Sequence, residues 1–179
     1  MSNLNARQER YRRRLLEERC VVLWNELLEA ADVEVVAQAL SETICLEELN
    51  LGGNRIGNGG LFHIAGALPS CRLLSLHLER NKIGAKGAAY LAPALRDHQT
   101  LETLSLCLNN LGTCGASHLC SALSSCSTLR NLDLRGNAIG STGAAEIVRS
   151  LPKGLKALNL ADNLIKSSGM ETVAELLSA

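Results

Sequence analysis

The chain has 179 residues, with 18 basic and 18 acidic side chains and a formal net charge of zero. This balance excludes the positive field that draws proteins nonspecifically to nucleic acids or anionic membranes. Its aromatic residues are one Trp, two Tyr and one Phe, too few to build stacking platforms for nucleic-acid bases.

The N-terminal residues 1–5 are polar and precede no apolar stretch of the kind found in a signal peptide. No segment has the run of apolar residues that a membrane-spanning helix needs. The seven cysteines include no pair at the short spacing typical of zinc sites. We therefore expect reduced structural thiols and no metal or cofactor, with redox sensing or metal binding by cysteines as the alternatives. The expected location is the reducing cytoplasm, and the alternatives are the cilium, the cytoskeleton and the nucleus.

Residues 5–30 carry Leu16, Leu23 and Leu27 on one stripe at helical spacing, which predicts one amphipathic helix. Within it, residues 7–14 contain the only cluster of arginines in the chain. We interpret this cluster as a solvated helix end. The alternatives are a contact with a partner or an acidic surface, and a nuclear-localisation or nucleic-acid role.

A second helix is predicted for residues 32–41, with Asp32 as its N-cap. Its apolar stripe follows steps of three, one and three residues and consists of Val33, Val36, Ala37 and Leu40. The same stripe recurs in every later helix, so we interpret this segment as the helical half of a degenerate repeat. Residues 1–45 are therefore predicted to form a helical cap over the first strand of the array.

From residue 46 to residue 179, the pattern Leu-x-x-Leu-x-Leu-x-x-Asn recurs five times. Its asparagines are Asn54, Asn81, Asn109, Asn137 and Asn163, at spacings of 27, 28, 28 and 26 residues. The last two leucines of each copy are separated by one residue, which places both on one face of a short strand. A repeat of this length is typical of a solenoid in which each unit contributes one strand and one helix.

The repeated Asn side chain offers two donors and an acceptor at the end of each predicted strand. We predict a structural asparagine ladder, in which each amide bonds the backbone of its own turn and of the next repeat. Six residues after each Asn, the same position always holds glycine: Gly60, Gly87, Gly115, Gly143 and Gly169. Small and apolar residues follow at helical spacing, so neighbouring helices are expected to pack closely.

The last predicted strand, at residues 157–160, is followed by one helix with no polar cap after it. We therefore expect the C-terminal strand to be a bare sheet edge. Such an edge is suited to docking another chain or subunit, and the alternative is a short edge that is simply solvated.

The full consensus, Leu-x-x-Leu-x-Leu-x-x-Asn-x-Ile-Gly-x-x-Gly-Ala-x-x-Leu-Ala-x-x-Leu, resembles the ribonuclease-inhibitor class of leucine-rich repeats. NOD-like receptors, the Ran GTPase-activating protein and several cytoskeletal and ciliary proteins also carry this repeat class. The resemblance covers residues 46–179. It implies an α/β fold, a right-handed horseshoe-shaped solenoid with parallel strands on the concave face and helices on the convex face.

The concave face of such a solenoid is predicted from the strand residues that alternate with the buried leucines. This face is polar, of mixed charge, and without Trp or Tyr. The predicted protein-binding residues are Glu48, Asn50, Ser75, His77, Glu79, Arg80, Thr103, Ser105, Cys107, Asn131, Asp133, Arg135, Asn159 and Asp162. The alternative is that this face is only solvated and that the ends or the helices bind partners.

Outside the repeat pattern we find no phosphate-binding loop, nucleophile elbow or metal-ligand cluster, and we predict no catalytic residue. The leading hypothesis is a non-catalytic protein–protein interaction module, an adaptor or scaffold subunit of a larger assembly. Its partners are expected to be proteins, neither nucleic acid nor membrane. One alternative is a regulator of the Ran GTPase-activating type, in which Arg55 and Arg80 would contact a GTPase. Another is a ciliary or cytoskeletal structural subunit.

Overall fold

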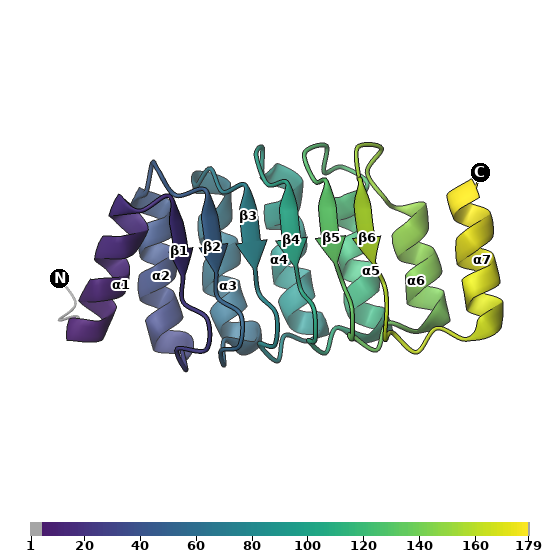
Figure 1. Cartoon of the computed structure of the whole chain (residues 1–179), viewed down its shortest axis with the longest axis horizontal. Coiled ribbons are helices and arrows are strands. Elements are labelled where there is room, and N and C mark those ends of the chain that lie inside the picture. Colours follow the sequence, from purple (N-terminus) through teal and green to yellow (C-terminus); the bar gives the residue numbers. More distant parts are fainter. Residues whose placement is uncertain (1–4, 179) are drawn as a thin grey trace.

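A computed structural model of the chain describes residues 5–178, which form one layer of strands and one layer of helices (Figure 1). The six strands form one parallel sheet in sequence order. They are β1 (Cys20–Val22), β2 (Glu48–Asn50), β3 (Ser75–His77), β4 (Thr103–Ser105), β5 (Asn131–Asp133) and β6 (Ala157–Asn159). The helices are α1 (Ala6–Glu17), α2 (Ala30–Glu42), α3 (Gly57–Ala67), α4 (Ala85–Asp97), α5 (Gly112–Leu123), α6 (Gly140–Arg149) and α7 (Ser167–Ser178), with a 3-10 turn at Leu68–Ser70. The predicted α/β leucine-rich-repeat solenoid is confirmed.

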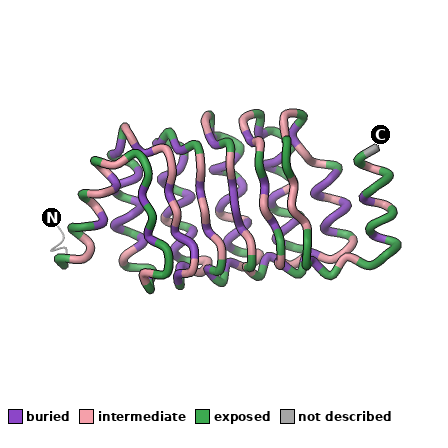
Figure 2. The backbone as a smooth tube through the Cα atoms, in the orientation of Figure 1, coloured by how far each residue is buried: buried purple, intermediate pink, exposed green. Residues whose placement is uncertain are grey.

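The strands are aligned with no slip from one repeat to the next. From β2 to β6 the central residue of each strand is a leucine that pairs with the central leucine of its neighbour, as Leu76 does with Leu104 and Leu104 with Leu132. The central leucines of β2 to β5 are buried between the sheet and the helices, whereas Leu158 of β6 is only partly buried. The two flanking residues of each strand face the other way, and buried stretches recur along the middle of the array (Figure 2). Because the helices are spaced more widely than the strands (Figure 1), the sheet lies on the concave side.

The glycine six residues after each ladder Asn permits close packing of adjacent helices. A Cβ atom at Gly143 would lie 3.1 Å from Cβ of Ala116 on α5 and 2.6 Å from Cγ2 of Ile139. Any larger side chain would push α6 away from α5, so this position accepts only glycine without a shift.

The N-terminal segment contributes a strand, and the prediction of a single helix over residues 5–30 is wrong. Helix α1 ends at Glu17, and β1 pairs Val21 with Leu49 of β2. Two features oppose a continuous helix: the β-branched pair Val21 and Val22, and the left-handed backbone of Asn25 and Leu27, with φ near 56° and 55°. The sheet therefore has six strands, one more than the five predicted from the pattern.

Helix α2 matches the predicted helix at residues 32–41, and its stripe from Val33 to Leu40 is buried. The predicted N-cap is wrong, because the helix begins earlier and Glu29 occupies that position. Asp32 instead accepts a hydrogen bond from the Glu29 amide at 3.3 Å, within the first turn of the helix. Together, β1 and α2 form a complete repeat without the leucine pattern.

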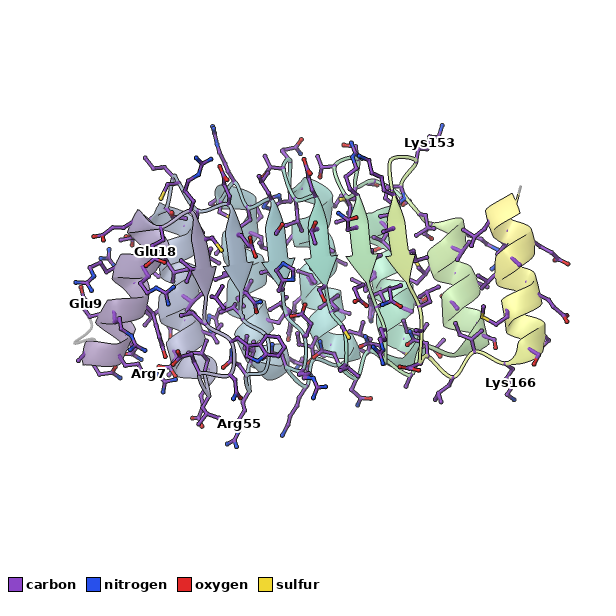
Figure 3. All side chains as sticks on the ribbon, in the orientation of Figure 1. Arg7, Glu9, Glu18, Arg55, Lys153 and Lys166 are labelled. Carbon is purple, nitrogen blue, oxygen red and sulfur yellow. The ribbon has the colours of Figure 1, made fainter. Side chains whose placement is uncertain are left out.

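In this first repeat, Glu26 stands where the later repeats have the ladder Asn. Leu28 N, two residues after Glu26, donates to Asn54, just as Ile56 N, two residues after Asn54, donates to Asn81. Tyr11 of α1 donates its hydroxyl to Glu26 Oε2 at 3.1 Å, and Arg7 donates to the Tyr11 hydroxyl and to the Glu26 carbonyl. The arginine cluster therefore helps to attach the capping helix, on which Figure 3 labels Arg7. Arg12 pairs with Glu42 at 2.5 Å and Arg14 with Glu18 at 2.9 Å.

The asparagines at the strand ends link each repeat to the one before it. The Asn137 amide donates to the carbonyl groups of Leu134 and Arg135 in its own turn and of Leu106 in the preceding repeat. Its Oδ1 accepts from Leu111 N at 3.4 Å, also in the preceding repeat. The bonds thus run backwards along the chain, not to the next repeat as predicted. Asn163, the last ladder asparagine within residues 5–178, bonds the preceding repeat in the same way, through the Leu134 carbonyl.

His98, at the turn after α4, should make stability depend on pH. The ring is buried, and its Nδ1 accepts from Thr100 N at 3.3 Å and Leu101 N at 3.1 Å. Burial lowers the pKa of His98, so the unfolded chain binds a proton at a higher pH than the folded chain does. This contribution to stability is complete above the unfolded value near 6.5 and is lost as the pH falls below it.

We expect the wild type to lose more unfolding free energy between pH 7.5 and pH 5.5 than a His98→Asn variant, which retains an acceptor but does not titrate. Urea unfolding at the two pH values measures both losses. Because the pKa of His77 is raised and acts in the opposite direction, the comparison uses the difference between the two proteins, in which the His77 contribution cancels. Equal losses in the two proteins would show that the protonation of His98 does not control stability.

Candidate protein-binding face

The predicted binding residues are aligned in rows across the concave face. One row runs from Asn50 through His77, Ser105 and Asp133 to Asn159, each paired with the next in register. A parallel row runs from Glu48 through Ser75 and Thr103 to Asn131. Glu79, Arg80, Cys107, Arg135 and Asp162 follow the strands, where the chain turns toward the helices. Strand pairing thus brings side chains about 28 residues apart in sequence into contact, as when Asn131 donates to Thr103 at 3.1 Å.

A hollow of about 350 Å³ lies on this face over β4, β5 and β6, with His77 and Glu79 from the β3 repeat at one side. Each of the strands β4, β5 and β6 contributes three residues to its lining. The polar residues that line it are His77, Glu79, Thr103, Ser105, Asn131 and Asp133, with Asn159 at one side. It therefore holds two carboxyl groups and no Lys or Arg in its lining, which favours groups that donate hydrogen bonds.

His77 and Glu79 form a hydrogen-bonded pair in the hollow. Nδ1 of His77 lies 3.2 Å from Oε1 of Glu79, and its Nε2 lies 3.9 Å from Oε1 of Glu48. The hydrogen bond to Glu79 raises the pKa of His77 against the opposing effect of burial. Burial tends to raise the pKa of Glu79, but His77 and the adjacent Ser105 hydroxyl outweigh it, and the pKa of Glu79 is lowered. The Glu79 carboxylate is therefore ionised in the hollow.

One oxygen of Glu79 remains without a partner. Oε2 is buried and forms no hydrogen bond of acceptable geometry within residues 5–178, although the Ser105 hydroxyl is near enough to influence the carboxylate electrostatically. A buried, unsatisfied carboxylate oxygen is costly.

At the C-terminal side of the face, the charged residues pair with each other. Arg135 Nε donates to Asp162 Oδ2 at 2.8 Å, while the Arg135 amide donates to Asp133 Oδ1 at 2.9 Å. Arg80 is exposed beyond β3. The structure thus brings seven of the predicted residues together in the hollow and pairs Arg135 with Asp162 beside it. The other five line neither feature: Glu48, Asn50, Ser75, Arg80 and Cys107.

Three concave residues were missed in the sequence: Cys20, Val22 and Trp24, all from the unrecognised first repeat. Val22 pairs with Asn50, and Trp24 follows at the position that Glu79 occupies two repeats later. The Trp24 ring lies against Gly52, where a Cβ atom would be 2.0 Å from the ring and 2.9 Å from Glu79 Oε2. Trp24 is 46% exposed, so the prediction of a face without Trp or Tyr is wrong. The Val21–Val22 pair in the sequence was the available signal for a strand.

Within residues 5–178, no group of three or more His, Cys, Asp or Glu side chains is arranged to hold a metal ion. In the same part of the chain, no helix has both the length and the apolar character needed to cross a membrane.

Comparison with known proteins gives the repeat type. The family described as "Leucine Rich repeat" matches residues 44–65, 70–92 and 125–148. The chain is 35% identical to the ribonuclease inhibitor of Mus musculus over 79 residues, 43% of this chain and 17% of the inhibitor. The matched segment therefore spans less than a fifth of the inhibitor's length.

Two solved structures share the fold. Leiomodin-1 actin-binding site 2 has a TM-score of 0.65 and 20% identity, covering 99% of this chain and 89% of that chain. The tropomodulin C-terminal domain of Caenorhabditis elegans has a TM-score of 0.60 and 15% identity, covering 96% of this chain and 91% of that chain. At these identities the similarity shows a common fold alone.

Proposed function

Since this chain is a ribonuclease-inhibitor-like leucine-rich-repeat protein, we propose that it is a non-catalytic protein-interaction module, an adaptor or scaffold subunit that binds a partner on its concave face. The observation that carries this proposal is the hollow over β4, β5 and β6, which with His77 of β3 joins side chains from four strands into one concave polar surface. Concave surfaces with a few convergent polar groups are the usual sites of recognition.

The chemistry of the hollow indicates which partner surface fits. Glu79 and Asp133 supply carboxylates, and Thr103, Asn131 and Asn159 add neutral polar groups. A partner segment with Arg, Lys or amide side chains would place donors against these groups. Trp24, next to the Glu79 carboxylate, offers a rigid aromatic surface of the kind found at interface hot spots.

The concave cysteine is poorly suited to catalysis. Burial, with Asp133 second, raises the pKa of Cys107, so its thiol carries little of the nucleophilic thiolate form near neutral pH. The other concave groups are either paired with each other or lack the base–nucleophile arrangement of a hydrolase. These features favour binding over reaction.

Charge reversal in the hollow should abolish partner binding without unfolding the chain. A Glu79→Lys/Asp133→Lys variant replaces both carboxylates with cations that repel a donor-rich partner. In affinity capture from native extract followed by mass spectrometry, we expect the specific partners of the wild type to be lost from this variant. Circular dichroism and a melting curve verify its folding. The single variant Asp133→Lys serves as a milder test of the same surface, because it leaves the His77–Glu79 pair intact.

The matched control is Glu34→Lys/Glu171→Lys, which makes the same change in charge on exposed positions of α2 and α7. This control should retain the wild-type partners. If the hollow variant and the control capture the same partners, the binding site is not the concave face.

A cytoskeletal role is the second candidate, and the named actin-binding function of the leiomodin-1 structure motivates it. Co-sedimentation with actin filaments tests it directly. Pelleting of the wild type with actin, lost in the hollow variant, would identify actin as the concave partner. Absence of pelleting at micromolar concentrations would rule out this candidate.

A further inference from the structure

Positive charge is concentrated at the edge of the array where the strands lead into the helices. Residues 49–96 contain six basic side chains and one acidic side chain, Glu79, although the whole chain has 18 of each kind. Four of the six lie at this edge in the repeats of β2 and β3, and all four are exposed: Arg55, Arg80, Lys82 and Lys86. We call these four residues the basic edge. Figure 3 shows Arg55 there, pointing away from the ribbon.

The turns of two adjacent repeats bring these cations together. Arg80 and Lys82 flank the ladder residue Asn81, and Arg55 holds the position of Lys82 in the preceding repeat. Gly57 N donates to the Asn81 carbonyl at 2.9 Å, so the two turns lie side by side. Because adjacent strands of a sheet are about 5 Å apart, the three cations share a small area of surface.

The charges of the basic edge have no counterpart in the described part of the chain. Within residues 5–178, none of the four side chains forms an ion pair. Glu79 is hydrogen-bonded to His77, and Glu29 is exposed at the start of α2 without pairing to these cations. Lys86 lies 6.0 Å from the centroid of the Tyr90 ring, at the helical margin of the edge. The cations repel one another, so their grouping does not stabilise the folded chain.

The helix ends add to this positive potential. Each repeat's helix begins at this edge (Figure 1), so the positive end of its dipole lies there. The first turns of α3, α4, α5 and α6 contain no acidic residue, whereas those of α1 and α2 contain Glu9 and Asp32. The start of α4 is capped by a neutral side chain, since Asn58 Oδ1 accepts from Gly84 N at 2.8 Å and Gly87 N at 2.9 Å.

Two exposed leucines border the basic edge. Leu27 holds the position of Arg55 in the first repeat, and Leu108 holds the position of Arg80 in the repeat of β4. Leu27 is 58% exposed and Leu108 38%. Cations between two apolar side chains are complementary to a segment that carries both carboxylates and apolar side chains.

We propose that the basic edge binds an acidic segment of a protein partner. The carboxylates of this segment meet Arg55, Arg80 and Lys82, and its apolar side chains contact Leu27 and Leu108 on either side. A nucleic-acid strand fits less well, because cations confined to two adjacent repeats can follow only about three of its phosphates. The inference does not rest on the concave-face proposal, since none of these residues lines the hollow.

Fluorescence anisotropy with a labelled acidic peptide tests this proposal on the 179-residue chain. The peptide consists of four Glu-Glu-Leu units with blocked ends, and a Gln-Gln-Leu peptide of the same length is its neutral counterpart. We expect saturable binding of the acidic peptide at micromolar concentrations of the chain, weakened by added salt, and no binding of the neutral peptide.

Charge reversal at the basic edge should weaken binding of the acidic peptide roughly tenfold or more. The variant is Arg80→Glu/Lys82→Glu, which places two carboxylates against those of the peptide. Both side chains are exposed and unpaired, so its melting curve should match that of the wild type. The matched control is Lys153→Glu/Lys156→Glu, the same change in charge at exposed positions of the opposite edge, where Figure 3 labels Lys153. This control should bind the peptide as the wild type does.

Several results would overturn the proposal: no saturable binding by the wild type, equal affinity of the two charge-reversal variants, or equal binding of the neutral peptide. An oligothymidylate of the same charge that bound more tightly than the acidic peptide would assign the edge to nucleic acid instead. The hollow variant Glu79→Lys/Asp133→Lys should bind the acidic peptide at least as tightly as the wild type. Loss of peptide binding in the hollow variant would place the segment in the hollow and contradict the proposal. Partner capture by that variant tests the concave face separately.

Discussion

Replacing Leu106 with alanine is expected to lower the free energy of unfolding by roughly 2–5 kcal/mol. Leu106 follows β4 in the middle of the array, and its side chain is fully buried in the core between sheet and helices. Repeats on both sides restrain its surroundings, so the cavity cannot collapse freely. Urea unfolding followed by circular dichroism measures the change.

The control for this substitution lies on the same sheet but faces the opposite way. Asp133→Ala removes a partly exposed side chain on the concave face and should change stability by no more than about 0.5 kcal/mol. A melting temperature of Leu106→Ala equal to that of the wild type would mean that the register of the strands is wrong.

The second large effect is expected at the asparagine ladder. Asn137→Ala removes three donated hydrogen bonds and leaves the buried Leu111 amide without its acceptor. Each buried backbone group left unpaired costs roughly 1–3 kcal/mol, so we expect a total loss of about 2–4 kcal/mol. The same urea unfolding measurement applies.

Asn131→Ala makes the same chemical change on the exposed face, where the side chain donates only to Thr103. Its cost should be small, within about 0.5 kcal/mol. If both alanine variants lost the same stability, the ladder would contribute nothing beyond an ordinary surface asparagine.

The repeats from β2 onward could be predicted because each position of the pattern meets one structural requirement. Leucines at alternating positions require a strand with one buried face, and the Asn requires backbone partners at its end. The direction of the ladder could not be predicted in this way, since an amide can bond the repeat before or after it. Only the geometry of the turn selects the preceding repeat.

The first repeat was misread because two patterns compete in the same residues. Leu16, Leu23 and Leu27 follow helical spacing, yet Leu27 is exposed and has a left-handed backbone. The β-branched pair Val21 and Val22 determines the strand, because pairing with β2 outweighs local helix propensity. The same error placed Trp24 on a helix and hid it from the binding face.

The concave residues follow from alternation along the strands, but the hollow does not. Its lining combines residues of β4, β5 and β6 with His77 and Glu79, and this combination appears only when the strands are aligned.

The most direct test of the concave-face proposal is oxidative footprinting of the complex that the wild type captures. The proposal predicts that Trp24 and His77, which lie on the concave face, become protected from oxidation in the complex. Phe62 and Tyr90, whose rings pack together on α3 and α4 of the opposite face, should react as they do in the free chain. Protection of Phe62 and Tyr90 with unchanged oxidation of Trp24 and His77 would contradict it and place the binding site on the helices.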